Sequence, residues 1–257
     1  MKKIFVLIAA VCMTYTTAFA QTVKPFKEGE RAVFLGNSIT DGGHYHSYIW
    51  LYYMTRFPNM PLRILNGGIG GDTAYDMNKR LDGDIFPMKP SVLMVTFGMN
   101  DSGYFEYNGD NPKEFGEQKY QESIKNYQQM EKRFKDLPDT RIVMVGTSPY
   151  DETVQLKENV PFKTKNETIK RIVEYQKESA AKNNWEFTDL NAPMVALNQQ
   201  NQQKDPAFTL CGSDRIHPDN DGHMVMAYLF LKAQGFVGKE VAEMEINANK
   251  KQAVKAE

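Results

Sequence analysis

Side chains of the types that catalyse acyl transfer occur at two distant places in the chain, namely Ser38 near the start and Asp214 with His217 near the end. Ser38 closely follows the β-type run at 32–36, so a turn there lifts its hydroxyl to the edge of a sheet, near free backbone N–H groups. Asp214 and His217 are three residues apart, and the carboxylate can orient one imidazole nitrogen while the other faces the serine. The pattern predicts a nucleophile, an orienting acid and a general base.

Two further segments offer hydrogen-bond donors for a developing negative oxygen. Asn66–Thr73 is rich in glycine, which lets a backbone approach a ligand closely, and Gly71 has an N–H to offer. Asn100 follows the β-type run at 92–98 and carries an uncharged amide donor. We therefore expect Gly71 and Asn100 to form an oxyanion hole beside Ser38.

Alternating β-type and helical runs are expected to position these residues. The five β-type runs lie at 32–36, 63–66, 92–98, 141–146 and 185–190. Helical apolar spacing occurs at 47–57, 72–81, about 112–135, 164–183 and 222–235. This alternation predicts an α/β fold, a five-stranded parallel sheet between two helical layers. Active sites of such sheets form beyond the carboxyl ends of the strands, where these candidates lie.

Four blocks, GNSIT, NGGIGGDT, FGMND and DRIHP, occur in this order between Gly36 and Pro218. Together they resemble the signature blocks of the SGNH hydrolases, the GDSL-like esterase family. The resemblance implies a flavodoxin-like three-layer α/β/α sandwich, with Ser38 as nucleophile and its own N–H as a third oxyanion donor beside Gly71 and Asn100. It implies His217 as base and then acid, oriented by Asp214.

The chain departs from the family pattern in the first block, where Asn37 stands in place of aspartate. This removes a charge beside the serine but no atom of the mechanism, so we expect activity to survive. In the second block, Gly68 or Gly70 remains an alternative to Gly71 as the donor. We also expect Asn37 and Tyr104 to contact substrate.

Several candidate residues have simpler structural interpretations. Asp101 is read as a structural loop acid, and Cys211 as a buried structural thiol because no cysteine-protease signature surrounds it. His44 and His46 line the pocket or lie on the surface, and His223 packs against or caps the last helix. The histidines and Cys211 show no recognisable metal-ligand spacing, so we expect no metal and no cofactor.

The composition and the termini indicate an exported single domain. Residues 1–20 carry Lys2 and Lys3, a short apolar run and Ala18-Phe19-Ala20, which is typical of a signal peptide cleaved near Ala20. We predict a hydrolase domain over 21–246 and a charged tail over 247–257, either a frayed helix or the start of a link. The remaining 29 basic and 32 acidic residues give a formal charge of −3, which does not favour nucleic acid.

The expected activity is hydrolysis of carboxylic esters. An acidic, exported esterase that needs no metal fits the removal of small acyl groups such as acetyl from carbohydrates. A lipase, lysophospholipase or thioesterase with the same fold is an alternative, and a carbohydrate-binding protein without catalysis is another. The expected partner is a small ester or an acylated carbohydrate. We expect no stable insertion of the protein into a membrane, and we expect the cleaved protein to be periplasmic or extracellular. The sequence leaves the oligomeric state open.

Overall fold

The computed structural model describes residues 22–157, 160–238, 244–247 and 252–256. Its centre is a parallel sheet of five strands in the order β2-β1-β3-β4-β5. The strands are β1 Arg31–Gly36, β2 Arg63–Gly68, β3 Val92–Val95, β4 Arg141–Gly146 and β5 Glu186–Asp189. This order is that of the flavodoxin-like fold, so the predicted fold class is confirmed.

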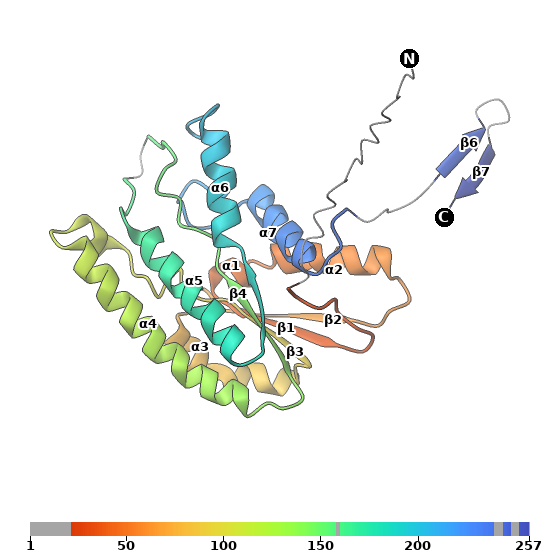
Figure 1. The fold of residues 1–257 in the computed structure, drawn as a ribbon, viewed down its shortest axis with the longest axis horizontal. Coiled ribbons are helices and arrows are strands. Elements are labelled where there is room, and N and C mark those ends of the chain that lie inside the picture. The colour runs from red at the N-terminus through yellow and green to blue at the C-terminus, as the bar shows by residue number, and fades with distance from the viewer. Residues whose placement is uncertain (1–21, 158–159, 239–243, 248–251, 257) are drawn as a thin grey trace, which may run out of the picture.

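Helices cover both faces of the sheet (Figure 1). The α-helices are α1 Ser38–Asp41, α2 His44–Arg56, α3 Ala74–Arg80, α4 Pro112–Lys135, α5 Lys165–Lys182, α6 Asn191–Gln202 and α7 Asn220–Ala233. Short helical turns follow α3 at Leu81–Ile85 and Phe86–Met88, and a third spans Phe105–Asn108. Helix α2 packs against α7 on one side of the molecule, and α3 and α5 pack against α4 on the other.

Alternate side chains of each central strand enter different cores. Ala32 and Phe34 of β1 join the cluster under α2 and α7, whereas Val33 and Leu35 join the cluster under α3 and α4. Successive side chains of a strand point to opposite faces, so a strand apolar at every position is buried on both sides. The burial of β1 therefore explains why it reads as a continuous apolar run.

One helix and the C-terminal segment differ from the sequence-based expectation. Helix α6 occupies a stretch in which no helix was predicted. Residues in the predicted tail form strands rather than a frayed helix: β6 Met244–Asn247 pairs antiparallel with β7 Gln252–Ala256, in a sheet separate from the first.

The predicted signal peptide at 1–20 lies outside the described residues. Within the parts of the chain that the structure describes, no helix is long and apolar enough to cross a membrane.

Candidate active site

The turn after β1 presents Ser38 at the carboxyl edge of the sheet. Asn37 adopts an extended conformation and caps α1, and its Oδ1 accepts a hydrogen bond from the Ile39 N–H at 3.1 Å. Ser38 is the first residue of that helix and is half-buried. A Cβ at Gly68 would lie 2.2 Å from the Asp41 backbone nitrogen, so glycine is required for β2 to pass this close to the nucleophile turn.

Ser38, His217 and Asp214 are joined by hydrogen bonds. The Ser38 Oγ lies 2.8 Å from Nε2 of His217, and Nδ1 of the same ring lies 2.5 Å from Oδ2 of Asp214. The other carboxylate oxygen of Asp214, Oδ1, accepts hydrogen bonds from the backbone N–H groups of Ile216 and His217, both at 2.9 Å. The carboxylate thus orients the ring so that its other nitrogen faces the serine.

The contact between the acid and the base shifts both of their pKa values. The hydrogen bond to Asp214 raises the pKa of His217 above its ordinary value, against the effect of burial. Burial raises the pKa of Asp214, but the hydrogen bonds from His217 and Ile216 outweigh it and hold that pKa below its usual range. The pair therefore consists of an ionised carboxylate and an imidazole that binds a proton more readily than a free one.

The loop after β2 narrows the choice of the backbone oxyanion donor. Gly68 already donates its N–H to Oδ1 of Asn66 at 2.9 Å, so it is not free to bind an oxyanion. Gly71 adopts a φ of +85°, which favours glycine, and a Cβ there would meet nothing within 4 Å. Gly70 and Gly71 lie at the exposed edge of this loop. Gly71 thus keeps its place as a candidate, and Gly68 does not.

Asn100 is fixed to the same loop. Its Nδ2 donates one hydrogen bond to the carbonyl of Asp72, the residue after Gly71, at 2.9 Å. Its Oδ1 accepts a hydrogen bond from the Tyr104 hydroxyl. An amide nitrogen carries two hydrogens, so one N–H of Asn100 remains for a ligand.

The two residues expected to contact substrate lie in supporting positions. Asn37 is 1 % exposed, and its side-chain oxygen serves as the helix cap. The Tyr104 hydroxyl binds Asn100, and burial raises the pKa of this phenol, which keeps its proton available for donation. Asn37 therefore supports the turn that carries Ser38, and Tyr104 orients the amide of Asn100.

The partly buried Arg80 and the fully buried Arg215, which the sequence analysis did not single out, also hold the site together. Arg80 donates to Oδ2 of Asp72 at 2.6 Å and to the Gly67 carbonyl at 2.8 Å, which ties the glycine loop to helix α3. Arg215, between the acid and the base, is 1 % exposed and donates to the carbonyls of Asp151 and Val154. The sequence shows that Arg215 follows Asp214, but it does not indicate that Arg215 is buried.

The remaining polar candidates have structural surroundings. Asp101 is buried and accepts hydrogen bonds from the N–H groups of Ala74 and Gly98, as expected of a loop acid. Cys211 is fully buried and contacts the Pro149 carbonyl. His223 stacks on His44 with 5.0 Å between ring centroids, and burial lowers its pKa to about 4. Among the described residues no group of three His, Cys, Asp or Glu side chains is placed to hold a metal ion.

A family model described as the GDSL-like Lipase/Acylhydrolase family matches residues 34–225. An acetylxylan esterase from Geobacillus stearothermophilus is 26 % identical over 224 residues, which cover 81 % of this chain and 95 % of that protein. A crystal structure of an acetylxylan esterase from the same organism matches at a TM-score of 0.64 and 24 % identity, covering 82 % of this chain and 96 % of that one.

Two further relatives are matched over only part of their own length. A solved structure described as a gut microbial diltiazem-metabolizing enzyme is 85 % identical, with a TM-score of 0.88. The match covers 92 % of this chain but 54 % of that one, so this chain spans about half the length of that protein. An uncharacterized lipoprotein from Bacillus subtilis (strain 168) is 35 % identical over 79 residues, 28 % of this chain and 32 % of that protein.

Proposed function

Because the chain belongs to the GDSL-like lipase/acylhydrolase family and is therefore a carboxylic ester hydrolase, we propose that it is an exported serine esterase that removes small acyl groups, above all acetyl, from carbohydrates. The observation that carries this proposal is the hydrogen-bonded series from the Ser38 Oγ through His217 to Asp214.

The first half of the reaction forms an acyl-enzyme. The Ser38 Oγ attacks the ester carbonyl while Nε2 of His217 takes the hydroxyl proton. Asp214 stabilises the imidazolium that results. The carbonyl oxygen becomes an oxyanion and accepts hydrogen bonds from the N–H groups of Ser38, Gly71 and Asn100. His217 then gives its proton to the leaving alcohol oxygen, and the acyl group stays on the serine.

The second half returns the enzyme to its starting state. Water loses a proton to Nε2 of His217 and attacks the acyl-serine, and the same three donors stabilise the second oxyanion. Collapse of this intermediate releases the carboxylic acid, and the Ser38 Oγ recovers its proton from His217.

An acetyl group needs no deep acyl pocket. A cavity of about 280 Å³ includes Asn100 in its lining, with polar neighbours such as Thr73 and Lys119. A larger, apolar cavity of about 470 Å³ lies between α2 and α7. Neither cavity is lined by Ser38, Asp214 or His217, so neither serves as the acyl site in this proposal.

The relatives favour the same acyl group. The curated protein and the solved structure from Geobacillus stearothermophilus are both described as acetylxylan esterase, and another solved structure is described as a diltiazem-metabolizing enzyme. We extend this preference to acetylated carbohydrates and small acetyl esters.

Hydrolysis of p-nitrophenyl acetate, butyrate and octanoate by residues 21–257 tests the proposal. We expect acetate to be the best substrate and Ser38→Ala to abolish turnover. Asn100→Ala should lower kcat by about 10²- to 10³-fold with little change in KM, because it removes one oxyanion donor.

Other outcomes of this experiment would point to a different activity. A preference for octanoate would identify a lipase or thioesterase instead. Absence of serine-dependent turnover on these esters, on diltiazem and on acetylated xylan would favour a carbohydrate-binding protein. Equal rates for Asn100→Ala and the wild type would remove Asn100 from the mechanism.

Export is the second part of the proposal. It is supported by the charged and apolar pattern at 1–20 and by the resemblance to a lipoprotein. Expression of the full chain in a bacterial host should yield a protein that begins at Gln21 outside the cytoplasm, as N-terminal sequencing would establish. A product that retains residues 1–20 would contradict export by cleavage near Ala20.

A further inference from the structure

Lys165 is a buried lysine that the mechanism does not use. It is 0 % exposed, whereas lysine side chains are almost never buried completely unless they are paired. It is the first residue of α5, where the helix dipole disfavours a positive charge. The fold therefore keeps a cation where both burial and the helix end oppose it, and such sites are candidates for function.

The Lys165 ammonium is surrounded by oxygen acceptors. Nζ lies 2.7 Å from the Met99 carbonyl, 2.6 Å from the Ser102 Oγ and 2.5 Å from the Gly103 carbonyl. The Ser102 hydroxyl donates its own proton to the Met99 carbonyl, so it acts as an acceptor toward the lysine. Three acceptors need three N–H donors, which only the protonated amine supplies.

All of these acceptors belong to the loop that carries Asn100. Met99 precedes Asn100, and Ser102 and Gly103 follow it. Nζ also lies 3.9 Å from the centre of the Tyr104 ring, close enough for a cation–π contact. The hydroxyl of that same tyrosine binds Oδ1 of Asn100. Lys165 thus holds the loop on both sides of Asn100 and also the tyrosine that orients its amide.

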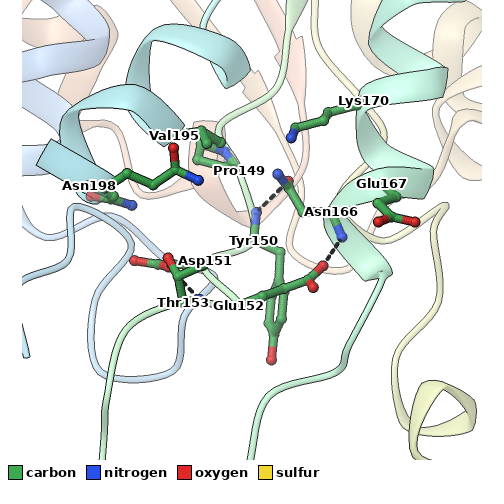
Figure 2. A pocket seen from close by; sticks show the side chains of 11 residues that line it. Pro149, Tyr150, Asp151, Glu152, Thr153, Asn166, Glu167, Lys170, Val195 and Asn198 are labelled. Atoms are coloured by element: carbon green, nitrogen blue, oxygen red, sulfur yellow. Dashed lines mark hydrogen bonds between the residues drawn. The ribbon is translucent and has the colours of Figure 1, made fainter. Parts of the chain in front are cut away.

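The start of α5 is built to place this lysine. Thr164 has a φ of +69°, a left-handed conformation that is unfavourable for a β-branched residue. The carboxylate of Glu152 accepts the N–H groups of Thr164 and Asn166, at 2.8 and 2.5 Å. Asn166 in turn accepts the Tyr150 N–H at 3.1 Å. Figure 2 shows the Glu152 carboxylate at the backbone N–H of Asn166, whose side chain is turned toward the backbone N–H of Tyr150.

Charges around Lys165 partly compensate its burial. Desolvation lowers the pKa of Lys165 to about 7, and the nearby carboxylates of Asp101 and Glu152 act in the opposite direction. The rings of Tyr104 and Tyr150 also face the ammonium. The pKa values of Asp101 and Glu152 are themselves raised, mainly by burial.

We propose that Lys165 is a positioning residue that holds the 99–104 loop so that the free N–H of Asn100 faces the oxyanion. The proposal rests on the function given above, because it assumes that Asn100 is an oxyanion donor. Lys165 itself touches neither substrate nor the reacting atoms. Its effect on the reaction passes through Asn100.

A double-mutant cycle on p-nitrophenyl acetate tests this coupling. We expect Lys165→Met to lower kcat by about 10- to 100-fold with little change in KM, because a misplaced donor loses its contact with the transition state. In the Asn100→Ala background the same substitution should lower kcat by less than about twofold, since the donor is already absent. Lys163→Met, an exposed lysine two residues away, is the matched control and should keep the wild-type rate.

The outcomes separate the two proposals. Equal rates for Asn100→Ala and the wild type would overturn both the oxyanion role and the positioning role. An impaired Asn100→Ala together with the same loss from Lys165→Met in both backgrounds would overturn the positioning role alone. An unchanged kcat in Lys165→Met would overturn it as well.

Tyr104→Phe keeps the test decisive if Lys165→Met does not fold, as judged by circular dichroism. This variant retains the ring under the ammonium and removes the hydroxyl that binds Asn100. We expect a threefold to tenfold lower kcat, of the order of one lost hydrogen bond, and no further loss in the Asn100→Ala background. An additive loss in both backgrounds would overturn the transmission of position through Tyr104.

Discussion

The proposed active site joins two regions that are built differently. The donor region, defined as residues 36–38, 68–73 and 98–104, follows three adjacent strands, β1, β2 and β3. The base region, defined as residues 209–218, is a single loop before α7 and contains no strand or helix. The two regions meet at the hydrogen bond between the Ser38 Oγ and Nε2 of His217.

The two regions are also held in different ways. In the donor region each loop follows a strand whose position the sheet fixes. Arg80 binds the Gly67 carbonyl at the start of the glycine loop, and Lys165 binds the Met99 carbonyl in the loop that carries Asn100. In the base region the Thr209 hydroxyl and the Arg215 guanidinium bind Asp151 in the loop after β4. Strand order therefore brings the donor loops to one edge, where Arg80 and Lys165 fix them, whereas the base region is held by polar contacts alone.

The largest effect is expected where the two regions meet. Asp214→Asn keeps an oxygen for the Ile216 and His217 N–H groups but removes the charge and favours the wrong imidazole tautomer, so kcat should fall on the order of 10³-fold. Because the hydrogen bond to Asp214 raises the pKa of His217, its loss should lower that pKa. The base is then neutral at lower pH, and the acid limb of kcat/KM should move to lower pH.

The pH profile of the remaining activity measures this shift. Ser47→Ala, an exposed serine on α2, serves as the control and should keep the acid limb of the wild type. An acid limb that stays in place in Asp214→Asn would mean that Asp214 does not set the pKa of His217.

An intermediate effect is expected from the anchor of the base region. Arg215→Met leaves the carbonyls of Asp151 and Val154 without this donor, so the free energy of unfolding should fall by about 2–4 kcal/mol. We expect kcat to fall about tenfold as well, because the loop that carries His217 loses its buried contact. Urea denaturation and p-nitrophenyl acetate hydrolysis measure the two effects.

Arg171→Met is the matched control for the arginine substitution. Arg171 forms an exposed ion pair with Glu117, and such pairs contribute at most about 1 kcal/mol. If Arg215→Met were as stable and as active as this control, the base region would not depend on its buried arginine.

The smallest effect is expected from the cap in the donor region. Asn37→Asp retains an oxygen for the Ile39 N–H and should change kcat and KM by less than about twofold. Asn37→Ala removes the cap and should cost about 1 kcal/mol of stability, also without a change in KM. A large rise in KM in either variant would show that Asn37 contacts substrate after all.

The same contrast explains what the sequence revealed. Strands β1, β3 and β4 were predictable because burial on both faces makes them continuous apolar runs, whereas β2 and β5 are only partly buried and were predicted from their place in the alternation. The strand ends then placed Ser38 and Asn100 at one edge. Helix α6 was missed because its sequence, NAPMVALNQQNQ, carries only a weak apolar stripe and a proline in the first turn. The pair of strands β6 and β7 was missed because MEIN alternates apolar and polar residues over four positions only, and QAVKA shows no regular alternation.

The supporting residues were harder to predict than the reacting ones. Lysines and arginines usually lie on the surface, so nothing in the sequence separated Lys165 and Arg215 from their exposed neighbours. Their burial depends on backbone carbonyls supplied by segments about 60 residues away in the chain. Such contacts arise only when the fold brings those segments together.

The most direct test of the account is labelling with a fluorophosphonate followed by intact-mass and peptide mass spectrometry of residues 21–257. If the donor and base regions together activate Ser38, the wild type gains one adduct on the peptide that contains Ser38. Ser38→Ala should gain none, and His217→Ala should react more slowly by at least about 10²-fold. Equal labelling of the wild type and His217→Ala, or an adduct on another residue, would contradict the account.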